Sequence, residues 1–293
     1  MNKDEVLAKL EMRVENLQQN LHALALMQQR NIQVLTQFKD LMLQQLTGVL
    51  QQQHVNPLNS FGGKVFSQTD EDGITLEIIK RLNLKNGVFA EFGVGNGLEN
   101  NTLLLAALGW KGFWVGGEDL AFNYRKTQRF FYQKSWITLE NIVQLANNGM
   151  HEVDAKSIDV VSLDLDGNDI YFVEALLSGG VTPKLFVVEY NAKFPPPINF
   201  KIKYDPAHQW KSDDYFGAAL MDFFELFDKR NYRLICCNAH TGANAFFVKK
   251  EFAGLFEDIP VDVSKLYMPP RYYLYTNYAN PTSAKTVEQI FGI

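Results

Sequence analysis

In the stretch Glu91-Phe-Gly93-Val-Gly95-Asn-Gly97, an acidic residue is followed by glycine at every second position. Glycine allows a tight turn and brings backbone amides close to a ligand, because no Cβ stands in the way. Ligands of open parallel sheets bind beyond the carboxyl ends of the strands, and this turn is expected at such an end. The spacing is not the dinucleotide pattern G-x-G-x-x-G, whose last glycine is replaced by Leu98, so a nicotinamide oxidoreductase is disfavoured. A structural turn without a ligand is the alternative.

A second apolar stretch, residues 112–116, is followed by the acidic pair Glu118-Asp119. A carboxylate at the end of the neighbouring strand can accept hydrogen bonds from both ribose hydroxyls of a nucleoside. We expect Glu118 in this role, although Gly116-Gly117 ahead of it leaves open whether Glu118 or Asp119 faces the ribose. The alternative is an exposed acidic pair in a loop.

Four oxygen-bearing side chains follow two later apolar runs: Asp164 and Asp166 after residues 158–163, Glu189 and Asn191 around the end of 185–188. Alternation along a strand puts each pair on one side, and adjacent strands lie about 5 Å apart, so the four can converge. Hard oxygen ligands suit Mg²⁺, Ca²⁺ or Mn²⁺, and carboxylates this close need a cation, a proton or hydrogen bonds. The alternative is structural, with Asp166–Asp169 capping the next helix.

The segment 193–210 is too long for a plain connection between a strand and a helix. It contains three consecutive prolines at 195–197 and a histidine, His208. Loops beyond strand ends often carry substrate contacts. We therefore expect this segment to cover an acceptor, with Trp210 and Tyr215 available to stack on a sugar ring. A surface insertion without a ligand role is the alternative.

These groups need a framework that brings them to one edge of a sheet. Beyond residue 63, apolar strand-like runs alternate with helical periodicity, which favours repeated βα units and a mostly parallel sheet. Strands are expected at 88–92, 112–116, 158–163, 185–188, 232–237 and 245–249, and helices at 75–84, 101–108 and 215–229. The last two strands predict a terminal antiparallel hairpin around His240. The expected fold class is therefore α/β and Rossmann-like.

Residues 1–53 have a different character, with no proline and no glycine before Gly48. Steps of three and four residues align Leu7, Leu10, Val14, Leu17, Leu21 and Leu24, and the same register continues to Val49. This spacing is typical of a coiled coil, in which Gln28 and Asn31 would help to fix the register. We predict an oligomerisation helix at 1–53 that makes a homo-oligomer, and a second domain at 54–293. A helix folded back onto its own domain is the alternative.

The composition excludes several classes of protein. The chain has 28 basic and 33 acidic residues, a net charge of −5 and a pI near 5.6, which is not the basic footprint of a nucleic-acid-binding protein. Cys236 and Cys237 form neither a disulfide framework nor a zinc site, which favours a reducing compartment. No apolar run is long enough for a membrane span, and the polar amino terminus is not a signal peptide. We therefore expect a cytoplasmic protein.

The glycine turn after one strand and the carboxylate after the next resemble the class I S-adenosylmethionine-dependent methyltransferases, over about residues 67–249. More closely, the chain is similar to FkbM-type and related sugar O-methyltransferases of bacterial polysaccharide and natural-product pathways. Six segments carry this resemblance: Ser67-Gln-Thr-Asp-Glu-Asp-Gly73, Asn101-Thr102, Gly109-Trp-Lys-Gly112, Asp164-Leu-Asp166-Gly-Asn-Asp169, Val187-Val-Glu189-Tyr-Asn191 and Gly242-Ala-Asn-Ala-Phe-Phe247.

The resemblance implies an enzyme that transfers a methyl group from S-adenosylmethionine to a hydroxyl of a sugar or sugar nucleotide, in the biosynthesis of a surface glycan such as capsule or O-antigen. It implies cofactor binding by Glu91, Gly93, Gly95, Gly97, Asn101, Thr102, Glu118, Asp119 and Asp164. Some methyltransferases of this kind use a divalent ion to hold two sugar hydroxyls and to lower the pKa of the one that attacks. Here Mg²⁺ or Mn²⁺ would be held by Asp164, Glu189 and Asn191.

An alcohol acceptor needs a base, or a metal that acidifies it. We expect catalytic roles for Asp166, Glu189 and His208, and the sequence leaves the identity of the base open among these residues and His240. A second class of function is not enzymatic: a methyltransferase-like scaffold or glycan-binding protein that assembles through its coiled coil. The acceptor and the position of its hydroxyl are not specified by the sequence.

Overall fold

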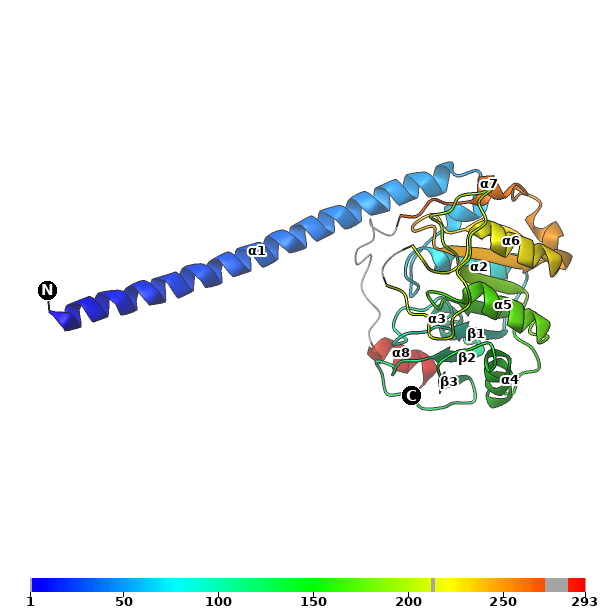
Figure 1. The fold of residues 1–293 in the computed structure, drawn as a ribbon, viewed down its shortest axis with the longest axis horizontal. Helices are drawn as coiled ribbons and strands as arrows, with labels where there is room; N and C mark the ends of the chain where they lie inside the picture. The colour runs from blue at the N-terminus through cyan, green and yellow to red at the C-terminus, as the bar shows by residue number, and fades with distance from the viewer. Residues whose placement is uncertain (1, 212–213, 272–283, 293) are drawn as a thin grey trace. The chain divides into compact units, whose positions relative to one another are not determined.

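The computed structural model describes residues 2–211, 214–271 and 284–292 (Figure 1). The chain divides into two compact units, which meet between Leu46 and Thr47. Helix α1 (Lys3–Gln53) forms the first unit and continues into the second. Its first turn carries Asp4 and Glu5, which interact favourably with the positive end of the helix dipole. The long N-terminal helix is confirmed, whereas its self-association and the domain boundary after residue 53 stay predictions.

A seven-stranded sheet forms the centre of the second unit, in the order β3-β2-β1-β4-β5-β7-β6. The strands are β1 (Val88–Phe92), β2 (Lys111–Gly116), β3 (Phe130–Lys134), β4 (Val160–Leu163), β5 (Leu185–Glu189), β6 (Tyr232–Cys237) and β7 (Asn244–Lys249). The strands from β3 to β5 are parallel, and β7 is antiparallel to β5 and β6. The expected α/β class, with a mostly parallel sheet and a terminal antiparallel hairpin, is confirmed. The strand order reverses between β1 and β4, which is consistent with a Rossmann-like fold.

Helices cover both faces of this sheet, as successive residues of β2 demonstrate. Trp114 Nε1 donates to Thr102 Oγ1, directly before α3 (Leu103–Ala107), whereas a Cβ at Gly149 of α4 (Ile142–Glu152) would meet the ring of Phe113. Neighbouring strand residues point to opposite faces, so α3 and α4 lie on opposite sides. Helices α5 (Asp169–Ser178) and α6 (Leu220–Lys229) continue the row begun by α4 (Figure 1).

Further short helical segments complete the second unit. They are η1 (Pro57–Phe61), α2 (Glu71–Arg81), η2 (Lys250–Phe256), α7 (Val263–Leu266) and α8 (Ala284–Phe291). Phe291 of α8 stacks on Phe130 of β3 with ring centroids 3.6 Å apart, so this helix closes the β3 end of the core. None of the helices in the described ranges is long and apolar enough to cross a membrane.

Several elements differ from the sequence expectation. Helix α2 spans Glu71–Arg81 rather than 75–84, and α6 begins at Leu220 rather than at residue 215. β3, α4 and α5 were not predicted. α4 contains Gly149 and two asparagines, which are poor helix formers and weaken its helix signal. α5 is apolar on nearly all sides, so it shows no strong helical periodicity.

Candidate active site

The carboxyl ends of the parallel strands border three neighbouring cavities. The largest, of about 430 Å³, shares Gly93 and Asp164 with a cavity of about 110 Å³, and it shares Gly117 and His208 with one of about 100 Å³. The residues that line the largest cavity are Gly93, Gly95, Gly117, Glu118, Trp136, Asp164, Leu165, Asp166, His208, Gln209 and Trp210. Segments that follow β1, β2, β4 and β5 in the sequence thus meet around one region.

The glycine turn after β1 has a positive φ at each of its three glycines, +97° at Gly93, +50° at Gly95 and +80° at Gly97. Residues with a Cβ adopt such values only at an energetic cost. A Cβ at Gly93 would lie 1.6 Å from the carbonyl oxygen of Asp164, so the turn packs directly against the end of β4. A Cβ at Gly95 would meet nothing within 4 Å, so the backbone there borders open space that a ligand can enter.

Glu91 is buried behind this turn and binds the start of α3. Its carboxylate accepts hydrogen bonds from the backbone N–H groups of Asn101 and Thr102 at 2.9 and 3.0 Å, and from the Thr102 hydroxyl at 2.5 Å. Burial raises the pKa of Glu91, and these hydrogen bonds oppose the rise. Glu91 and Asn101 line the 110 Å³ cavity, whereas Thr102 is buried between Glu91 and Trp114. Glu91 therefore forms part of the cavity wall, and Thr102 supports it from behind.

The two carboxylates of the acidic pair after β2 have different surroundings. Glu118 lines the largest cavity together with Gly93 and Gly95. Asp119 is 89% exposed, and its Oδ1 forms an ion pair with Lys134 Nζ at 2.7 Å. This geometry favours Glu118 over Asp119 as the residue that faces a ligand.

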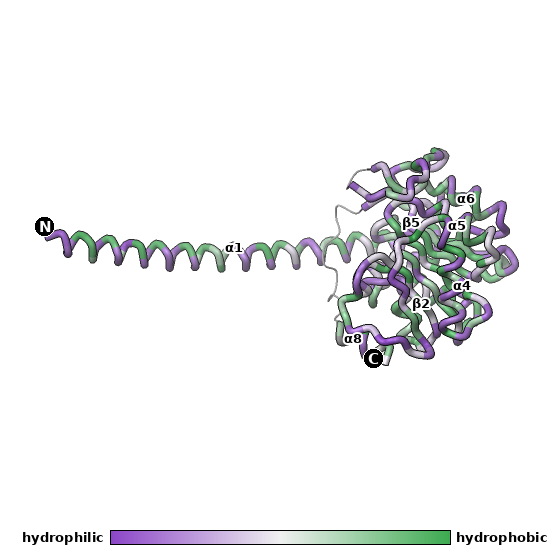
Figure 2. The backbone as a smooth tube through the Cα atoms, turned by 60° about the horizontal axis from the view of Figure 1, so that its bottom comes forward, coloured by the Kyte–Doolittle hydropathy of each residue, from purple (hydrophilic) through white to green (hydrophobic). Residues whose placement is uncertain are grey.

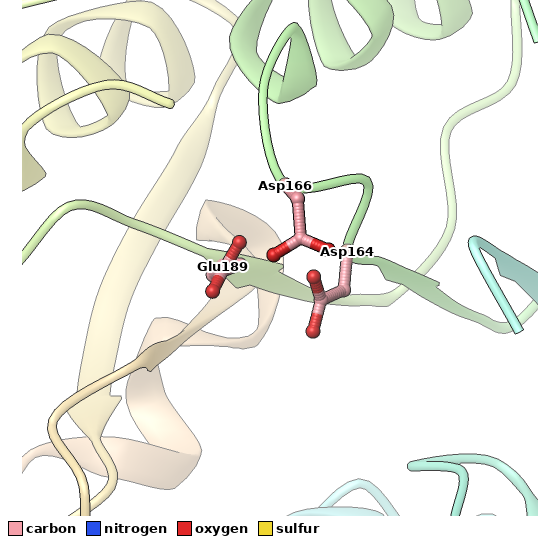
Figure 3. Close-up of side chains that lie close together, drawn as sticks. All are labelled: Asp164, Asp166 and Glu189. Atoms are coloured by element: carbon pink, nitrogen blue, oxygen red, sulfur yellow. The ribbon is translucent and has the colours of Figure 1, made fainter. Parts of the chain in front are cut away.

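Three carboxylates meet at the ends of β4 and β5 (Figure 3). Asp164, Asp166 and Glu189 each present one oxygen, and these oxygens lie within 4.8 Å of one another. The sheet register explains this meeting: Leu163 pairs with Val188, so the residues that follow them leave adjacent strands side by side. The structure thus brings together three of the four oxygen-bearing side chains that were expected to converge.

The proximity of these carboxylates is electrostatically unfavourable. Burial, together with the charges of Asp166 and Asp169, raises the pKa of Asp164 to about 8. Burial and the charge of Asp164 raise the pKa of Glu189 well above its usual value. Glu189 Oε2 is buried without a hydrogen-bond partner in the part of the chain that the structure describes. A proton or a cation would relieve this repulsion, so the group has the charge that a divalent cation requires.

Asn191, expected as a metal ligand, has a different environment. Its Nδ2 donates to the carbonyl oxygens of Asp214 and Phe216 at 2.9 and 3.0 Å, and its Oδ1 accepts from the Lys193 N–H at 3.2 Å. Asn191 therefore fastens the following loop to the end of β5. Its oxygen is occupied by the backbone, and the third side chain beside Asp164 and Glu189 is Asp166. This arrangement differs from the expected ligand set.

Asp166 adopts a left-handed backbone conformation with a φ of +52°, which aspartate tolerates but which still costs energy. Asp169 holds the loop in this shape, because its carboxylate accepts from the N–H groups of Leu165 and Gly167, both at 2.8 Å. The N-cap residue of α5 is Asn168, whose side chain makes no capping hydrogen bond. The acidic residues of this loop thus shape the turn rather than cap α5.

His208 lies against the same loop. A Cβ at Gly167 would come within 2.4 Å of His208 Cδ2, so glycine leaves the room that the imidazole occupies. Partial desolvation raises the pKa of Asp166, and the nearby charge of His208 opposes the rise. His208 Nε2 is buried, and no described residue forms a hydrogen bond with it. The structure thus brings His208 and Asp166 to one cavity wall.

The loop of residues 64–70 closes the 110 Å³ cavity, and sequence reasoning identified it only through the resemblance. Lys64 Nζ donates to the Gln68 carbonyl oxygen at 2.8 Å and to Glu99 Oε1 at 2.9 Å. The Lys64 side chain is 5% exposed and that of Glu99 is 48% exposed, and their ion pair joins the loop to the segment that follows the glycine turn. Gln68, Glu99 and Asn244 line the cavity.

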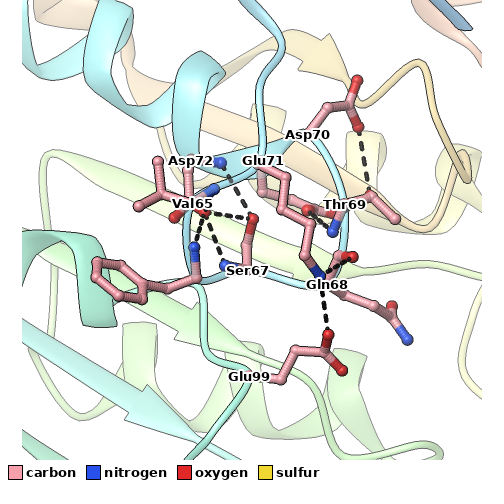
Figure 4. A network of polar contacts seen from close by, with 10 residues as sticks. Val65, Ser67, Gln68, Thr69, Asp70, Glu71, Asp72 and Glu99 are labelled. Atoms are coloured by element: carbon pink, nitrogen blue, oxygen red, sulfur yellow. Dashed lines mark hydrogen bonds and ion pairs between the residues drawn. The ribbon is translucent and has the colours of Figure 1, made fainter. Parts of the chain in front are cut away.

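Buried acidic residues at the start of α2 hold this loop in place. Asp72 Oδ2 accepts four hydrogen bonds of 2.6–2.9 Å, from the N–H groups of Val65, Phe66 and Ser67 and from the Ser67 hydroxyl (Figure 4). An anionic acceptor for several backbone N–H groups fixes a loop strongly, because each lost bond would leave a buried donor unsatisfied. Asp72 therefore sets the path of the chain before Gln68.

Glu71 connects the loop to the terminal hairpin. Its carboxylate accepts hydrogen bonds from Thr69, Asn238 and Asn244. Burial raises the pKa of Glu71 to about 7. The backbone N–H of His240 donates to Asp70 in the same network, so His240 is bound to this loop rather than to the carboxylates after β4 and β5.

A narrow slot of about 100 Å³ lies beside Glu118. Its apolar lining includes Trp136, Ile137, Leu165 and Phe172. Trp136 Nε1 donates to the Pro206 carbonyl oxygen at 3.0 Å, which connects the segment after β3 to the 193–210 loop. Sequence reasoning missed this slot because it missed β3, whose end positions Trp136.

The loop after β5 presents aromatic side chains near the cavity. Trp210 is 48% and Tyr215 is 49% exposed. Tyr215 lies 6.3 Å from the His208 ring, and Trp210 lies 5.9 Å from Phe216, measured between ring centroids. The expected contact of these rings with an acceptor stays a prediction.

No family model matches the chain, and no curated protein matches it either. Solved structures similar to it include the MycE methyltransferase from the mycinamycin biosynthetic pathway, in complex with Mg, SAH and mycinamycin VI, at 14% identity and a TM-score of 0.33. That match covers 60% of this chain and 45% of MycE. A low-resolution structure of WbdD, with its C-terminal bundle ordered to residue 505, matches at 15% identity and a TM-score of 0.33 over 59% of this chain and 33% of WbdD. The chain thus spans less than half of either neighbour, and the likeness is one of fold at most.

Proposed function

We propose that the chain is an S-adenosylmethionine-dependent O-methyltransferase that acts on a hydroxyl of a sugar or sugar nucleotide, in the biosynthesis of a surface glycan. One observation carries the proposal: Gly95 and Glu118 border the same cavity as Asp164 and Asp166. A donor bound along the glycine turn would therefore direct its reactive end towards these carboxylates. The segments that resemble sugar O-methyltransferases in sequence include the ones that supply these residues.

The three cavities fit the parts of S-adenosylmethionine, which supplies a methyl group on a positively charged sulfur when it is bound. Glu118 is available to accept hydrogen bonds from ribose hydroxyls. The slot beside it offers Trp136 and Phe172 to an adenine ring. The 110 Å³ cavity presents the carboxylates of Glu91 and Glu99, which suit the ammonium group of the methionyl end.

The carboxylates after β4 and β5 fit a divalent cation such as Mg²⁺ or Mn²⁺. Asp164, Asp166 and Glu189 offer hard oxygen ligands within 4.8 Å of one another, and their mutual repulsion favours a positive charge between them. Such an ion would hold acceptor hydroxyls and lower the pKa of the one that attacks. Asn191 would contribute indirectly, by holding the loop after β5.

Methyl transfer requires the acceptor oxygen to lie in line with the carbon–sulfur bond. The oxygen–carbon bond forms as the carbon–sulfur bond breaks, the electron pair stays on sulfur, and the acceptor proton passes to a base. We assign the base to His208, because its ring lines the cavity beside Asp166, whose negative charge would stabilise the protonated imidazole. Trp210 and Tyr215 would position the sugar by stacking on its apolar face.

Calorimetry of the full chain with S-adenosylmethionine and S-adenosylhomocysteine tests the proposal. We expect saturable binding of both at one site per chain. Protein with an intact circular dichroism spectrum that binds neither compound would refute the enzyme reading. Transfer of a labelled methyl group to sugar nucleotides, with and without Mg²⁺, then tests the acceptor class and the cation.

The second candidate, a methyltransferase-like scaffold, is favoured by the long helix α1, which offers an assembly surface. The double variant Asp166→Asn, Glu189→Gln separates the two functions. An enzyme would lose methyl transfer and its cellular role together, whereas a scaffold would keep its cellular role. Binding of S-adenosylhomocysteine serves as the control for folding, since Glu118 and the glycine turn are unchanged.

A further inference from the structure

We infer that α1 binds a second copy of this chain as a parallel, in-register coiled coil. The apolar residues of its seam are all 48–67% exposed within the first unit: Leu7, Leu10, Val14, Leu17, Leu21, Leu24, Leu35, Phe38 and Met42. Hydrophobic segments recur along the whole helix (Figure 2). A continuous apolar stripe of this kind is typical of helices that pair along a 3.5-residue repeat.

The flanks of the seam add to its apolar surface. Met27, Val34 and Leu41 lie on one side of it and Ile32 and Leu46 on the other, each more than half exposed. Between residues 16 and 46 the charged side chains are Arg30, Lys39 and Asp40. This stretch therefore lacks the charged outer surface that keeps a solitary helix in water.

A second copy is electrostatically acceptable as the partner, because the charges of α1 cancel. They are Lys3, Lys9, Arg13, Arg30 and Lys39 against Asp4, Glu5, Glu11, Glu15 and Asp40. The apolar seam residues of two helices would bury roughly 1,000 Å² together, and the flanking residues bring the total into the range of about 1,200–2,000 Å² of stable interfaces. The face is thus large enough for stable self-association.

The polar residues of the seam select the orientation. Gln28, Asn31 and Gln45 occupy positions of the apolar repeat. A parallel, in-register pair places each of them opposite its own copy, where amide side chains can hydrogen-bond to each other. The seam alternates two heptad positions, and in an antiparallel pair each residue at one position faces a residue at the other. Gln28 is at the first position, and Asn31 and Gln45 are at the second. In any antiparallel register at least one of the three therefore faces an apolar side chain.

The residues beside the seam are compatible with this register. From residue 6 to residue 46, the charged side chains at flanking positions are Glu11, Arg13 and Lys39. In the parallel pair they face Val6, Gln18 and Val34 of the second copy, so no two like charges meet. Met27 faces Ile32 of the second copy, and Leu41 faces Leu46, which extends the apolar contact on both sides.

Light scattering during size-exclusion chromatography of the full chain tests the association. We expect twice the 33.5 kDa chain mass. Leu24→Glu should shift the protein to monomer, whereas Leu26→Glu should not, because Leu26 lies on the outer face of the pair. Leu24 and Leu26 are 58% and 53% exposed, so the two variants differ only in their position relative to the seam. A monomeric wild type, or equal effects of both variants, would overturn the inference.

Disulfide formation tests the orientation. Cys236 and Cys237 are buried, so one added cysteine on α1 reports on the helix alone. Leu10→Cys should form an interchain disulfide under mild oxidation, because position 10 lies next to its own copy in a parallel pair. Gln19→Cys, on the outer face, should not. An oligomer in which Leu10→Cys fails to cross-link would overturn the parallel arrangement. Neither experiment depends on the proposed methyl transfer.

Discussion

Asp164 and Glu189 lie side by side at the ends of two neighbouring parallel strands. One carboxylate oxygen of each lies within 4.8 Å of the other and of an oxygen of Asp166. Burial raises the pKa of both carboxyls. Two adjacent carboxyl groups with raised pKa values do not stabilise a fold by themselves, which fits the cation that we propose for this group. The stability of the cation-free protein should therefore improve when one of them is neutralised.

Asp164→Asn should raise the melting temperature of the cation-free chain at pH 8.5, above the raised pKa, by roughly 2–8 °C. The same substitution should abolish the thermal shift produced by Mg²⁺ or Mn²⁺. In the wild type, a cation at a concentration of a hundred times its Kd stabilises the folded state by about 2.7 kcal/mol, which raises the melting temperature by roughly 5–10 °C. Scanning fluorimetry measures both effects. Asp119→Asn, which removes an exposed carboxylate outside the group, should keep the full cation shift.

The raised pKa of Glu71 makes the free energy of unfolding depend on pH, and no cation is involved. Burial raises its pKa from 4.5 to about 7, so the folded state keeps a proton that the unfolded state releases between these values. The free energy of unfolding should therefore fall as pH rises through this window, by about 3 kcal/mol from this group. Urea unfolding at pH 5 and 7.5 measures the fall. Glu71→Gln should reduce the fall by this amount and leave the part that comes from other carboxyls with a raised pKa, such as Asp164. Glu257→Gln at the surface should leave the whole fall unchanged.

The fold could be predicted from the sequence where its signals are local. The alternation of apolar runs and helical periodicity gave the parallel sheet and the terminal hairpin, and β1 and β6 lie where they were expected. The glycine turn was recognisable because its backbone requires glycine: Gly93 and Gly97 each adopt a positive φ that other residues disfavour, so the turn leaves a mark in the sequence. β3 was missed because it is a short edge strand in which buried residues alternate with partly exposed ones between polar segments.

The candidate site was predictable as a set of strand ends but not as a set of contacts. The sequence named Asp164, Asp166 and Glu189, yet it could not tell that Asn191 turns towards the backbone of its own loop. That orientation depends on a loop whose path is set by tertiary packing. The ion pair of Lys64 with Glu99 joins residues 35 positions apart, and no spacing rule connects them.

Glu118 and Asp119 provide a matched pair for ligand binding. Glu118→Gln should weaken binding of S-adenosylhomocysteine by roughly 10–100-fold, because a charged hydrogen-bond acceptor is worth about 1.5–3 kcal/mol. Asp119→Asn should change the affinity by less than about twofold, since its carboxylate is bound to Lys134 at the surface. Calorimetry with both variants measures the difference. A larger effect at Asp119 would reverse the assignment of the ribose contact.

Substitutions at Gly93 and Gly95 should have different effects, one on folding and the other on ligand binding. Gly93→Ala should prevent stable folding, because its Cβ would overlap the backbone of Asp164. Gly95→Ala adds only the cost of a left-handed alanine, about 1–2 kcal/mol, and should fold. Its methyl group would stand in the open space beside the cavity, so we expect loss of S-adenosylhomocysteine binding. Circular dichroism and calorimetry measure these outcomes, and a Gly95→Ala variant with normal affinity would exclude the turn from the binding surface.

Gly167 controls the position of His208 without being part of the reaction centre. A Cβ there would meet the imidazole at 2.4 Å, and the side chain, rather than the backbone, is expected to move. Gly167→Ala should therefore lower kcat by at least about tenfold, as expected for a displaced base, with little change in melting temperature. Binding of S-adenosylhomocysteine should persist, because Glu118 and the glycine turn are untouched. The pH profile of kcat separates the roles: if His208 is the base, its acidic limb should shift in Gly167→Ala and disappear in His208→Gln. A variant that keeps both kcat and the pH profile would remove His208 from the mechanism.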